Sequence, residues 1–457
     1  MDLRDRDVLV LGLGATGLSA ARWLTRRGAR VTVADTRHEP PGAAVLARQC
    51  PQAMLRTGVF APEVFAAHDL IVISPGLPKD QPPVREAVAR GATLVGDVEL
   101  FARHLPEGQK LLAITGSNGK STVTSLAGQL CEAAGFRTAV VGNIGLPVLD
   151  ALLAAEDAPD FPQVFVLELS SFQLETTSSL SATAATVLNL SEDHLDRYPG
   201  MAEYAAAKAR IFSGRGVQLL NRDDAATLAM ARPGRPVWTF GEAVPVDQTE
   251  WGLSGSSAPW LQHGGRRILP QSALRILGRH NAMNALAALA LVFALGAEEA
   301  ALAPALAAYG GLAHRTEPVA EKRGVLYIDD SKGTNVGATT AALKGLGRPA
   351  LLIAGGEGKG QDFSALAEAV GHCCRAVLTI GRDAPIIEQA LAAAGVPMKR
   401  CASLEVAVAR AAELAQAGDA VLLSPACASF DMFRDYAHRS EVFIAAVRAL
   451  PEGGASV

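Results

Sequence analysis

Short runs of β-branched and aliphatic residues recur along the chain. Each run ends in Gly, Ser, Asp or Asn and is followed by an amphipathic stretch rich in Ala and Leu. This alternation is typical of repeated β-α-β units and predicts mostly parallel sheets. The runs form three sets: residues 7–14, 30–35 and 69–76; residues 110–116, 137–143, 163–170, 183–191 and 216–221; and residues 324–332, 349–356, 376–381 and 419–426.

The three sets predict an α/β protein of three domains. Residues 1–100 should form a Rossmann-like domain, because the helical stretch near residue 100 leads into polar, Pro- and Gly-containing sequence. Residues 101–311 should form a central domain like a P-loop ATPase, with a mostly parallel sheet and a hinge at Gly310-Gly311. Residues 312–457 repeat the Rossmann-like pattern, and the polar, Gly/Ser-rich residues 241–277 predict hairpins and loops.

Composition narrows the classes of protein that remain. The 457 residues suit about three domains. With 42 basic and 46 acidic residues the net charge is -4, so we expect no nucleic-acid and no membrane partner. The longest apolar stretch, Ala285 to Leu295, is too short to span a bilayer, and the amino terminus lacks a signal-peptide pattern. The six cysteines show no C-x-x-C spacing, so free thiols and a cytoplasmic location are expected.

The first motif is Gly12-Leu13-Gly14-Ala15-Thr16-Gly17, which follows the first strand, with Asp35 at the end of the second. Its glycines permit a tight turn, and the next helix N-terminus attracts a pyrophosphate. The motif therefore indicates a site for a nucleotide diphosphate. An NAD(P) oxidoreductase has only this fingerprint in its favour, because no hydride-transfer constellation follows it.

The second motif, ITGSNGKST at residues 114–122, lies between a predicted strand and a predicted helix. Backbone N–H groups of such a loop can surround phosphates, Lys120 can neutralise their oxygens, and Ser121 or Thr122 can reach Mg²⁺. Ile114 occupies the position of the first Gly in the full GxxxxGK[ST] pattern, and a chance match in a loop is the alternative. The strand-loop-helix context favours a phosphate loop.

Polar residues at two further strand ends are candidate metal ligands. Glu168 falls inside an apolar strand, where a carboxylate is costly unless it is paired or binds a metal. His194, within the acidic segment Asp193–Asp196, could bind Mg²⁺ or orient a substrate, although a helix N-cap with a solvated His is the alternative. Lys208 by itself resembles an ordinary exposed helical lysine.

Taken together, these segments resemble the Mur ligases, the ATP-dependent amide-forming enzymes that build the peptide stem of peptidoglycan. TGSNGKST resembles the family's shortened phosphate loop, and the resemblance continues in order through GNIG (142–145), LELSSFQLE (167–175), NLSEDHLDRY (189–198), the AAK of Lys208, GRHNAMNALAAL (278–289) and His314-Arg315. DSKGTN (330–335), Asp35-Thr36-Arg37 and SPACAS (424–429) resemble the branch that adds D-glutamate. Ala313, Gly333 and Tyr436 depart from the family pattern.

The resemblance implies a reaction in which ATP converts a substrate carboxylate to an acyl-phosphate that an amine then attacks. The implied catalytic residues are Lys120, His194, Lys208 and Lys332. Two Mg²⁺ sites are implied, one near Ser121 and Glu168 and one near His194 and a carbamylated Lys208. The implied ATP-binding residues are Gly116, Ser117, Asn118, Gly119, Lys120, Ser121, Thr122, Asn281, His314, Arg315 and Asp330.

The implied partners are small molecules, UDP-N-acetylmuramoyl-L-alanine and D-glutamate, bound by a monomer. By resemblance, the substrates contact Gly14, Ala15, Thr16, Asp35, Thr36, Arg37, Gly76, Asn143, Thr334, Lys359, Ser429, Phe430 and Tyr436. A nucleotide-binding protein without catalysis would predict that these functional positions are broken, yet Lys120, Glu168, His194 and Lys208 are present. Sister ligases and folate polyglutamate synthases are the closer alternatives, and neither is expected to carry the DSKxTN box.

Overall fold

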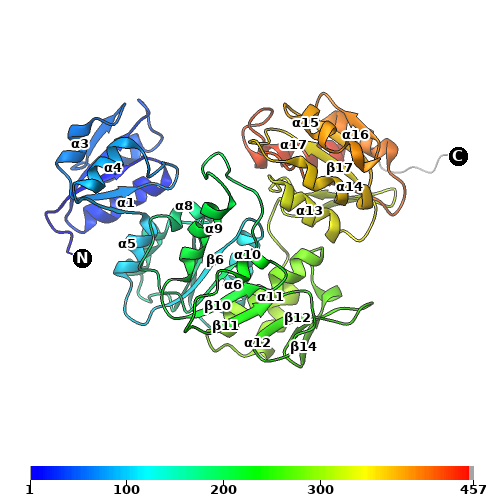
Figure 1. Ribbon diagram of the computed structural model, residues 1–457, viewed down its shortest axis with the longest axis horizontal. Helices are drawn as coiled ribbons and strands as arrows, with labels where there is room; N and C mark the ends of the chain where they lie inside the picture. Colours follow the sequence, from blue (N-terminus) through cyan, green and yellow to red (C-terminus); the bar gives the residue numbers. More distant parts are fainter. Residues whose placement is uncertain (1, 452–457) are drawn as a thin grey trace.

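Three α/β lobes follow one another along the chain (Figure 1). The structure is a computed structural model that describes residues 2–451. Each lobe has its own sheet with helices packed against it, and the amino-terminal and carboxy-terminal lobes lie apart from each other, both next to the central lobe. Because parallel pairing dominates all three sheets, the predicted α/β fold class is confirmed.

The amino-terminal sheet has five parallel strands in the order β3-β2-β1-β4-β5. Its elements are β1 (Asp7–Leu11), α1 (Ala15–Arg26), β2 (Arg30–Asp35), α2 (Ala43–Gln49), β3 (Met54–Thr57), α3 (Pro62–Ala66), β4 (Leu70–Ile73), α4 (Pro82–Ala89), β5 (Thr93–Val95) and α5 (Asp97–His104). A Cβ atom on Gly17 would lie 1.8 Å from the carbonyl oxygen of Gly12. Only glycine therefore lets α1 start so close to β1.

The central sheet has nine strands in the order β14-β13-β12-β11-β10-β9-β6-β8-β7. Its strands are β6 (Lys110–Thr115), β7 (Thr138–Gly142), β8 (Val164–Glu168), β9 (Ala184–Val187), β10 (Val217–Asn221), β11 (Val237–Phe240), β12 (Glu250–Ser254), β13 (Trp260–His263) and β14 (Arg266–Pro270). All neighbouring pairs are parallel except β12–β13 and β13–β14. These antiparallel pairs confirm the hairpins predicted within residues 241–277.

The helices of the central lobe cover both faces of its sheet. They are α6 (Lys120–Ala133), α7 (Val148–Asp157), α8 (Ser171–Leu174), α9 (Met201–Ala209), α10 (Ala225–Leu228), α11 (Arg279–Phe293) and α12 (Glu299–Ala308), with short 3₁₀ turns η1 (Arg210–Phe212) and η2 (Gln271–Ala273). Helix α11 is buried along most of its length and packs on α6. Among residues 2–451, no helix is long and apolar enough to cross a membrane.

The carboxy-terminal sheet has six strands in the order β15-β16-β20-β17-β18-β19, and β15–β16 is its one antiparallel pair. Its elements are β15 (Glu317–Lys322), β16 (Val325–Asp329), α13 (Val336–Gly345), β17 (Ala350–Gly355), η3 (Phe363–Leu366), α14 (Ala367–Cys373), β18 (Cys374–Ile380), α15 (Ala384–Ala390), η4 (Ala392–Ala394), β19 (Met398–Arg400), α16 (Leu404–Leu414), β20 (Ala420–Leu423) and α17 (Tyr436–Ala449). The predicted domain limit at residue 100 falls within α5, and the limit at 311 falls between α12 and β15.

Helix α1 fastens the amino-terminal lobe to helix α7 of the central lobe. Two arginines of α1 and the arginine that follows it pair with acidic residues of α7. The pairs are Arg22 with Asp150, Arg26 with Asp157 and Arg27 with Glu156. Trp23 is fully buried on the same helix, with the Arg27 guanidinium 3.9 Å from its ring centroid. Because the Gly12–Gly17 loop lies at the other end of α1, these contacts fix the position of that loop relative to the central sheet.

A buried histidine on β13, His263, links the antiparallel strands of the central lobe to neighbouring residues. The His263 ring stacks on Trp251, with the ring centroids 4.1 Å apart and the planes 3° apart. Nδ1 of His263 faces the Glu299 carboxylate, and Nε2 lies 2.9 Å from the carbonyl oxygen of Gln248. Both partners are acceptors, so both ring nitrogens must donate, which requires the imidazolium form. Burial lowers the pKa of His263, but the bonds to Glu299 and Gln248 outweigh that effect, and the pKa is raised overall.

We therefore predict that His263 stabilises the fold more in acid than in base. A raised pKa gives stability that is fully present below the unfolded value of about 6.5 and is lost as pH rises through the folded value. His263→Gln should lower the free energy of unfolding by about 1–3 kcal/mol at pH 6 and by less at pH 9. Urea unfolding at both pH values measures this, with the exposed His38→Gln as control. A deficit that grows with pH would contradict the assignment.

Candidate active site

The loop that joins β6 to α6 has the geometry of a phosphate loop. Its turn uses left-handed backbone at Gly119 (φ +83°), and a Cβ atom there would lie 2.5 Å from Oδ1 of Asn284. The side chain of Lys120 folds back over the loop, and its Nζ donates to the carbonyl oxygens of Gly116 at 2.8 Å and Ser117 at 2.9 Å. An ammonium group is thereby held at the centre of the loop.

Asn189, just after β9, fixes the shape of this loop from the neighbouring strand. Its Oδ1 accepts the backbone N–H of Asn118 at 2.8 Å, and its Nδ2 donates to the Asn118 carbonyl oxygen at 3.1 Å. The backbone at Asn118 is thus held at both its polar groups. Asn189 was not predicted as a site residue, although it lies in the NLSEDHLDRY segment that resembles the Mur ligases.

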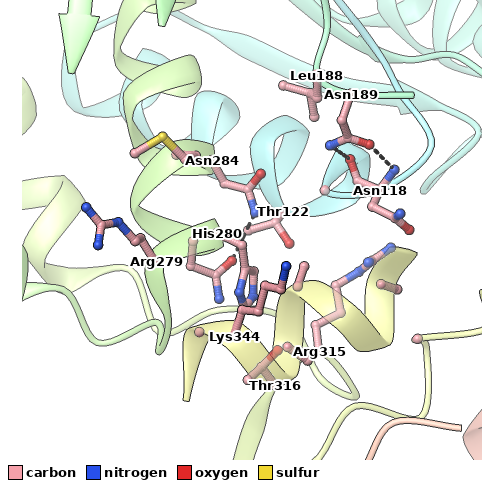
Figure 2. Close-up of a pocket in the computed structure, with 18 of the residues that line it drawn as sticks. Asn118, Thr122, Leu188, Asn189, Arg279, His280, Asn284, Arg315, Thr316 and Lys344 are labelled. Atoms are coloured by element: carbon pink, nitrogen blue, oxygen red, sulfur yellow. Dashed lines mark hydrogen bonds between the residues drawn. The ribbon is translucent and has the colours of Figure 1, made fainter. Parts of the chain in front are cut away.

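A cavity of about 330 Å³ lies between the phosphate loop, the start of α11 and the carboxy-terminal lobe (Figure 2). The predicted ATP-binding residues in its lining are Asn118, Gly119, Thr122, Asn281, Arg315 and Asp330. Asn189, His280, Asn284 and Lys344 also line it and were not predicted as site residues. The N-x-x-N spacing of Asn281 and Asn284 could have indicated Asn284, which donates to Asn281 Oδ1 at 3.0 Å.

A second cavity, of about 390 Å³, adjoins the first, because Asn118, Gly119 and Arg315 line both. Residues from the central and carboxy-terminal lobes contribute together. The predicted site residues in its lining are Ser117, Lys120, Ser121, Asn143, Glu168, His314, Lys332, Thr334 and Tyr436, in addition to the three shared ones, and Asp193 and Asn335 complete the polar lining. The structure therefore brings together motifs that are about 200 residues apart in sequence.

Glu168 presents an unpaired carboxylate oxygen at this cavity. The residue is 2% exposed at the end of β8, and its Oε1 accepts the Asn143 Nδ2–H group at 2.8 Å. Its other oxygen, Oε2, is buried and has no hydrogen-bond partner among the described residues. A buried carboxylate oxygen without a partner is costly, and it fits a cation ligand better than a structural role.

Lys208 is buried rather than exposed on α9. Its Nζ donates to the Gly116 carbonyl oxygen at 2.8 Å and to Thr115 Oγ1 at 3.3 Å. Burial and the nearby Lys120 charge lower the pKa of Lys208 well below its usual value, although the Asp193 and Glu168 carboxylates oppose the shift. The neutral form of this amine is therefore more accessible than that of a solvated helical lysine.

His194 is in a left-handed conformation with φ +57°. Its ring packs edge-on against Phe172, with the centroids 4.8 Å apart, and Nε2 lies 3.6 Å from Asp193 Oδ2. Burial lowers the pKa of His194, and the Lys359 and Lys120 charges lower it further. The Asp193 carboxylate opposes this shift. Neither His194 nor Lys208 is among the described residues that line the two cavities. Both belong to the charged cluster around the phosphate loop.

The segment from His314 to Thr316 links the central and carboxy-terminal lobes. His314 and Thr316 both have positive φ, +64° and +48°, and between them Arg315 donates from its guanidinium to Ser121 Oγ at 2.9 Å. Two left-handed non-glycine residues around one arginine indicate a backbone that the surrounding contacts hold in place.

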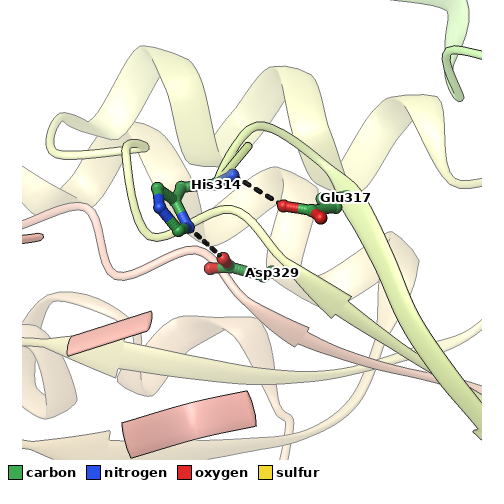
Figure 3. A group of neighbouring side chains, drawn as sticks. All are labelled: His314, Glu317 and Asp329. Carbon is green, nitrogen blue, oxygen red and sulfur yellow. Dashed lines mark hydrogen bonds and ion pairs between the residues drawn. The ribbon is translucent and has the colours of Figure 1, made fainter. Parts of the chain in front are cut away.

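Acidic side chains supply those contacts (Figure 3). The backbone N–H of His314 donates to Glu317 Oε2 at 2.9 Å, and its Nδ1 lies 2.9 Å from Asp329 Oδ2. The three side chains could offer ligand atoms within 4.8 Å of one another. Because these carboxylate oxygens already bond to His314, the cluster positions the segment from His314 to Thr316 rather than forming a metal site.

Asp330 follows in the same strand-end loop. It accepts the Ser424 hydroxyl at 2.6 Å and the Thr316 backbone N–H at 3.1 Å. Burial raises the pKa of Asp330 to about 6 despite these bonds. Its place in the lining of the first cavity leaves it near any nucleotide bound there.

The loops after β16, β17 and β20 meet at one edge of the carboxy-terminal sheet. Lys332 Nζ lies 3.9 Å from the Tyr436 ring centroid, and both line the second cavity. Glu357 and Ala428 exchange backbone hydrogen bonds at 2.9 Å, so the loops that carry Lys359 and Ser429 are joined. Among the predicted substrate-binding residues of this lobe, Lys359, Ser429 and the 68% exposed Phe430 lie outside the lining of either cavity.

The predicted nucleotide-diphosphate site lies in the amino-terminal lobe, with Ala15 and Thr16 opening α1 and Gly14 preceding it. Asp35 accepts the Leu13 backbone N–H at 2.7 Å and binds the Arg37 guanidinium at 2.9 and 2.7 Å. The Arg37 bond is the main reason that the pKa of Asp35 falls to about 2. Gly14 and Gly76 leave open space beside their Cα atoms, and the exposed Thr36 follows Asp35.

The sequence matches known domains along most of its length. Residues 6–96 match the Mur ligase MurD-like N-terminal domain, residues 114–292 the Mur ligase middle domain, and residues 314–427 the Mur ligase glutamate ligase domain.

Full-length relatives agree with these matches. Proteins named UDP-N-acetylmuramoylalanine--D-glutamate ligase from Thiobacillus denitrificans and Methylobacillus flagellatus are 58% and 54% identical to this chain. The first alignment covers 100% of this chain and 99% of the relative, and the second covers 98% of each.

Solved structures share the fold at low identity. A pseudomurein peptide ligase type C from Methanothermus fervidus is 17% identical, with a TM-score of 0.58 over 92% of this chain and 96% of its own. UDP-N-acetylmuramate-alanine ligase from Thermotoga maritima is 18% identical, with a TM-score of 0.57 over 97% of this chain and 100% of its own. From its three matched domains and its full-length relatives, we conclude that the chain belongs to the Mur ligase family.

Proposed function

We propose that this protein is an ATP-dependent ligase that adds D-glutamate to UDP-N-acetylmuramoyl-L-alanine in peptidoglycan precursor synthesis, releasing ADP and phosphate. Relatives named for this reaction are 50–58% identical over nearly the whole chain. The structural observation that carries the proposal is the second cavity. In it, the phosphate-loop Lys120 and the unpaired Glu168 oxygen face Lys332 and Thr334 of the DSKGTN box.

The first step must bring two anions together, the terminal phosphate of ATP and the substrate carboxylate. Lys120, Arg315 and Lys332 all line the second cavity, so their fixed positive charges oppose that repulsion. Asn143 is held by Glu168 at the same wall, and we assign it to the precursor's reacting end. The acyl-phosphate that forms is then attacked by the amine of D-glutamate, which yields the amide and releases phosphate.

Mur ligases use ATP and Mg²⁺. The orphaned Oε2 of Glu168 and the Ser121 hydroxyl fit one Mg²⁺, and His194 with a carbamylated Lys208 would hold a second. Bound Mg²⁺ supplies further positive charge for the transferred phosphoryl group. A carbamate on Lys208 replaces a cation by an anionic oxygen ligand, which suits Mg²⁺.

The adenosine of ATP and the uridine diphosphate of the precursor bind on either side of the reaction cavity. In the first cavity, Asn281 and Asn284 present amide groups for the adenine base, and Asp330 accepts from the ribose. In the amino-terminal lobe, the backbone from Gly14 to Thr16 approaches the diphosphate, with Thr36 and Arg37 beside the uridine. Because the reaction consumes ATP, we place it in the cytoplasm. We propose a monomer, because one chain carries both cavities.

The acceptor amino acid is the most direct test of this function. Purified protein should release phosphate from ATP with UDP-N-acetylmuramoyl-L-alanine only when D-glutamate is the amine, and not with L-alanine, L-lysine or meso-diaminopimelate. Lys359→Ala and Ser429→Ala should raise the KM for D-glutamate more than the KM for ATP, because both loops meet at the acceptor edge of the sheet. Lys344→Ala, in the nucleotide cavity, should do the reverse. Preferred use of another amine would refute the proposal.

Lys120→Ala should reduce turnover by at least about 100-fold, because it removes the charge that faces the transferred phosphoryl group. ADP release measures the effect. Lys110→Ala, at the other end of β6, removes a lysine whose Nζ bonds to the Leu295 carbonyl, far along the strand from the loop, and should remain near wild type. Near-normal ADP release by Lys120→Ala would remove the basis for assigning this loop to ATP.

A carbamate on Lys208 should be detectable by its chemistry. Its formation requires a neutral amine, which the lowered pKa of Lys208 supplies. Activity should fall when CO₂ is removed at mildly acidic pH and return with bicarbonate. Protein equilibrated with isotope-labelled bicarbonate should show a carbamate carbon signal in NMR spectra that is missing in Lys208→Arg. Full activity under strict CO₂ depletion, with no carbamate signal, would contradict this assignment.

A further inference from the structure

Two asparagine amides face each other across the boundary between the central and carboxy-terminal lobes. Nδ2 of Asn118 donates to Oδ1 of Asn335 at 3.2 Å, and Nδ2 of Asn335 donates back to Oδ1 of Asn118 at 3.1 Å. Asn118 belongs to the phosphate loop, and Asn335 ends the DSKGTN box, directly after Lys332, Gly333 and Thr334. The pair is a direct polar contact between the ATP loop and the segment that lines the opposite wall.

The amide of Asn335 uses its remaining hydrogen-bonding capacity as well. Its Oδ1 accepts the Ala338 backbone N–H at 2.8 Å and so caps helix α13, and its Nδ2 lies 3.4 Å from Asp193 Oδ2. The residue is 4% exposed. A carboxylate at this position would still cap the helix but could donate to neither Asn118 nor Asp193.

On the central-lobe side, Asn189 holds both backbone polar groups of Asn118, which fixes the backbone that carries its amide. The first turn of α13 lies directly on the same surface. A Cβ atom on Gly337 would come within 2.6 Å of Ser191 Oγ and 3.1 Å of Asn118 Nδ2.

We propose that Asn335 is a positioning residue, and that its amide pair with Asn118 is the latch by which the carboxy-terminal lobe closes on an ordered phosphate loop. This inference rests on the proposed function. Closure places Lys332 and Thr334 in the reaction cavity and adds Arg315, Asp330 and Lys344 to the nucleotide cavity. By linkage, a nucleotide that binds the closed lobe more tightly also favours closure. Loss of the latch disfavours closure and therefore weakens nucleotide binding.

Two variants weaken the latch without harming the lobe that carries it. Asn335→Asp keeps the helix cap and can still accept from Asn118 Nδ2, but it loses both bonds that Asn335 donates and sets a second carboxylate against Asp193. Gly337→Ala inserts a methyl group at the contact, while alanine favours the helix more than glycine does. Ser403→Asp, which also puts a carboxylate at a helix N-cap of this lobe but caps α16 outside both cavities, is the matched control.

ADP binding by calorimetry and small-angle scattering with ADP test the latch without requiring turnover. We expect both variants to weaken ADP binding by about 5- to 100-fold and to remain more extended than wild type with ADP. Binding of UDP-N-acetylmuramoyl-L-alanine should be unchanged, and melting temperatures should match that of Ser403→Asp. A double-mutant cycle with Asn118→Ala and Asn335→Ala should show effects on ADP affinity that are not additive.

If Asn335→Asp binds ADP as tightly as the wild-type protein and is as compact with ADP, the latch proposal is wrong. This holds whether or not the protein is a D-glutamate ligase. If the wild-type protein binds ADP but ligates no D-glutamate, and both variants still lose affinity and compactness, the latch stands and the proposed function fails. A general fall in stability that weakens ADP and the UDP precursor alike would also overturn the latch, because a structural defect has no reason to spare one substrate.

Discussion

The carbonyl oxygen of Gly116 accepts hydrogen bonds from Lys120 and Lys208, each at 2.8 Å, and the rest of the site depends on this contact. Burial is the main reason that the pKa values of both lysines are lowered; the Arg315 and Lys332 charges add to the shift of Lys120, and the Lys120 charge adds to that of Lys208. Glu168 and Asp193 partly balance them. The loop is therefore a positive, desolvated centre that favours phosphate and oxygen-rich ligands, and the surrounding polar residues are arranged around it.

The two outer lobes meet this centre through different kinds of contact. The amino-terminal lobe meets the central lobe through ion pairs from α1 to α7 and through the buried Trp23. The carboxy-terminal lobe meets the loop through polar contacts instead, the Arg315 bond to Ser121 and the Asn118–Asn335 pair. Contacts of this kind suit the proposed closure of this lobe.

The acidic residue of the glycine fingerprint is engaged by contacts within the protein. In dinucleotide-binding proteins the acidic residue at the end of the second strand accepts from a ribose. Here both oxygens of Asp35 are engaged by Leu13 and Arg37, so the carboxylate shapes the loop and holds the arginine. This arrangement favours a nucleotide recognised by Arg37 and backbone groups over a nicotinamide dinucleotide.

Local pattern alone determined the three α/β units, the hairpins near residues 250–270 and the strand-loop-helix setting of Lys120, because strand and helix periods and glycine turns depend on neighbours in sequence. Ordered motifs along the chain also identified the family. Only the tertiary structure decided which residues far apart in the sequence come into contact. Lys208 is buried against Gly116, Asn189 shapes the phosphate loop, and Asn335 reaches Asn118. Burial and long-range hydrogen bonds arise only when strand ends from different lobes converge, and no local pattern encodes which side chains then meet.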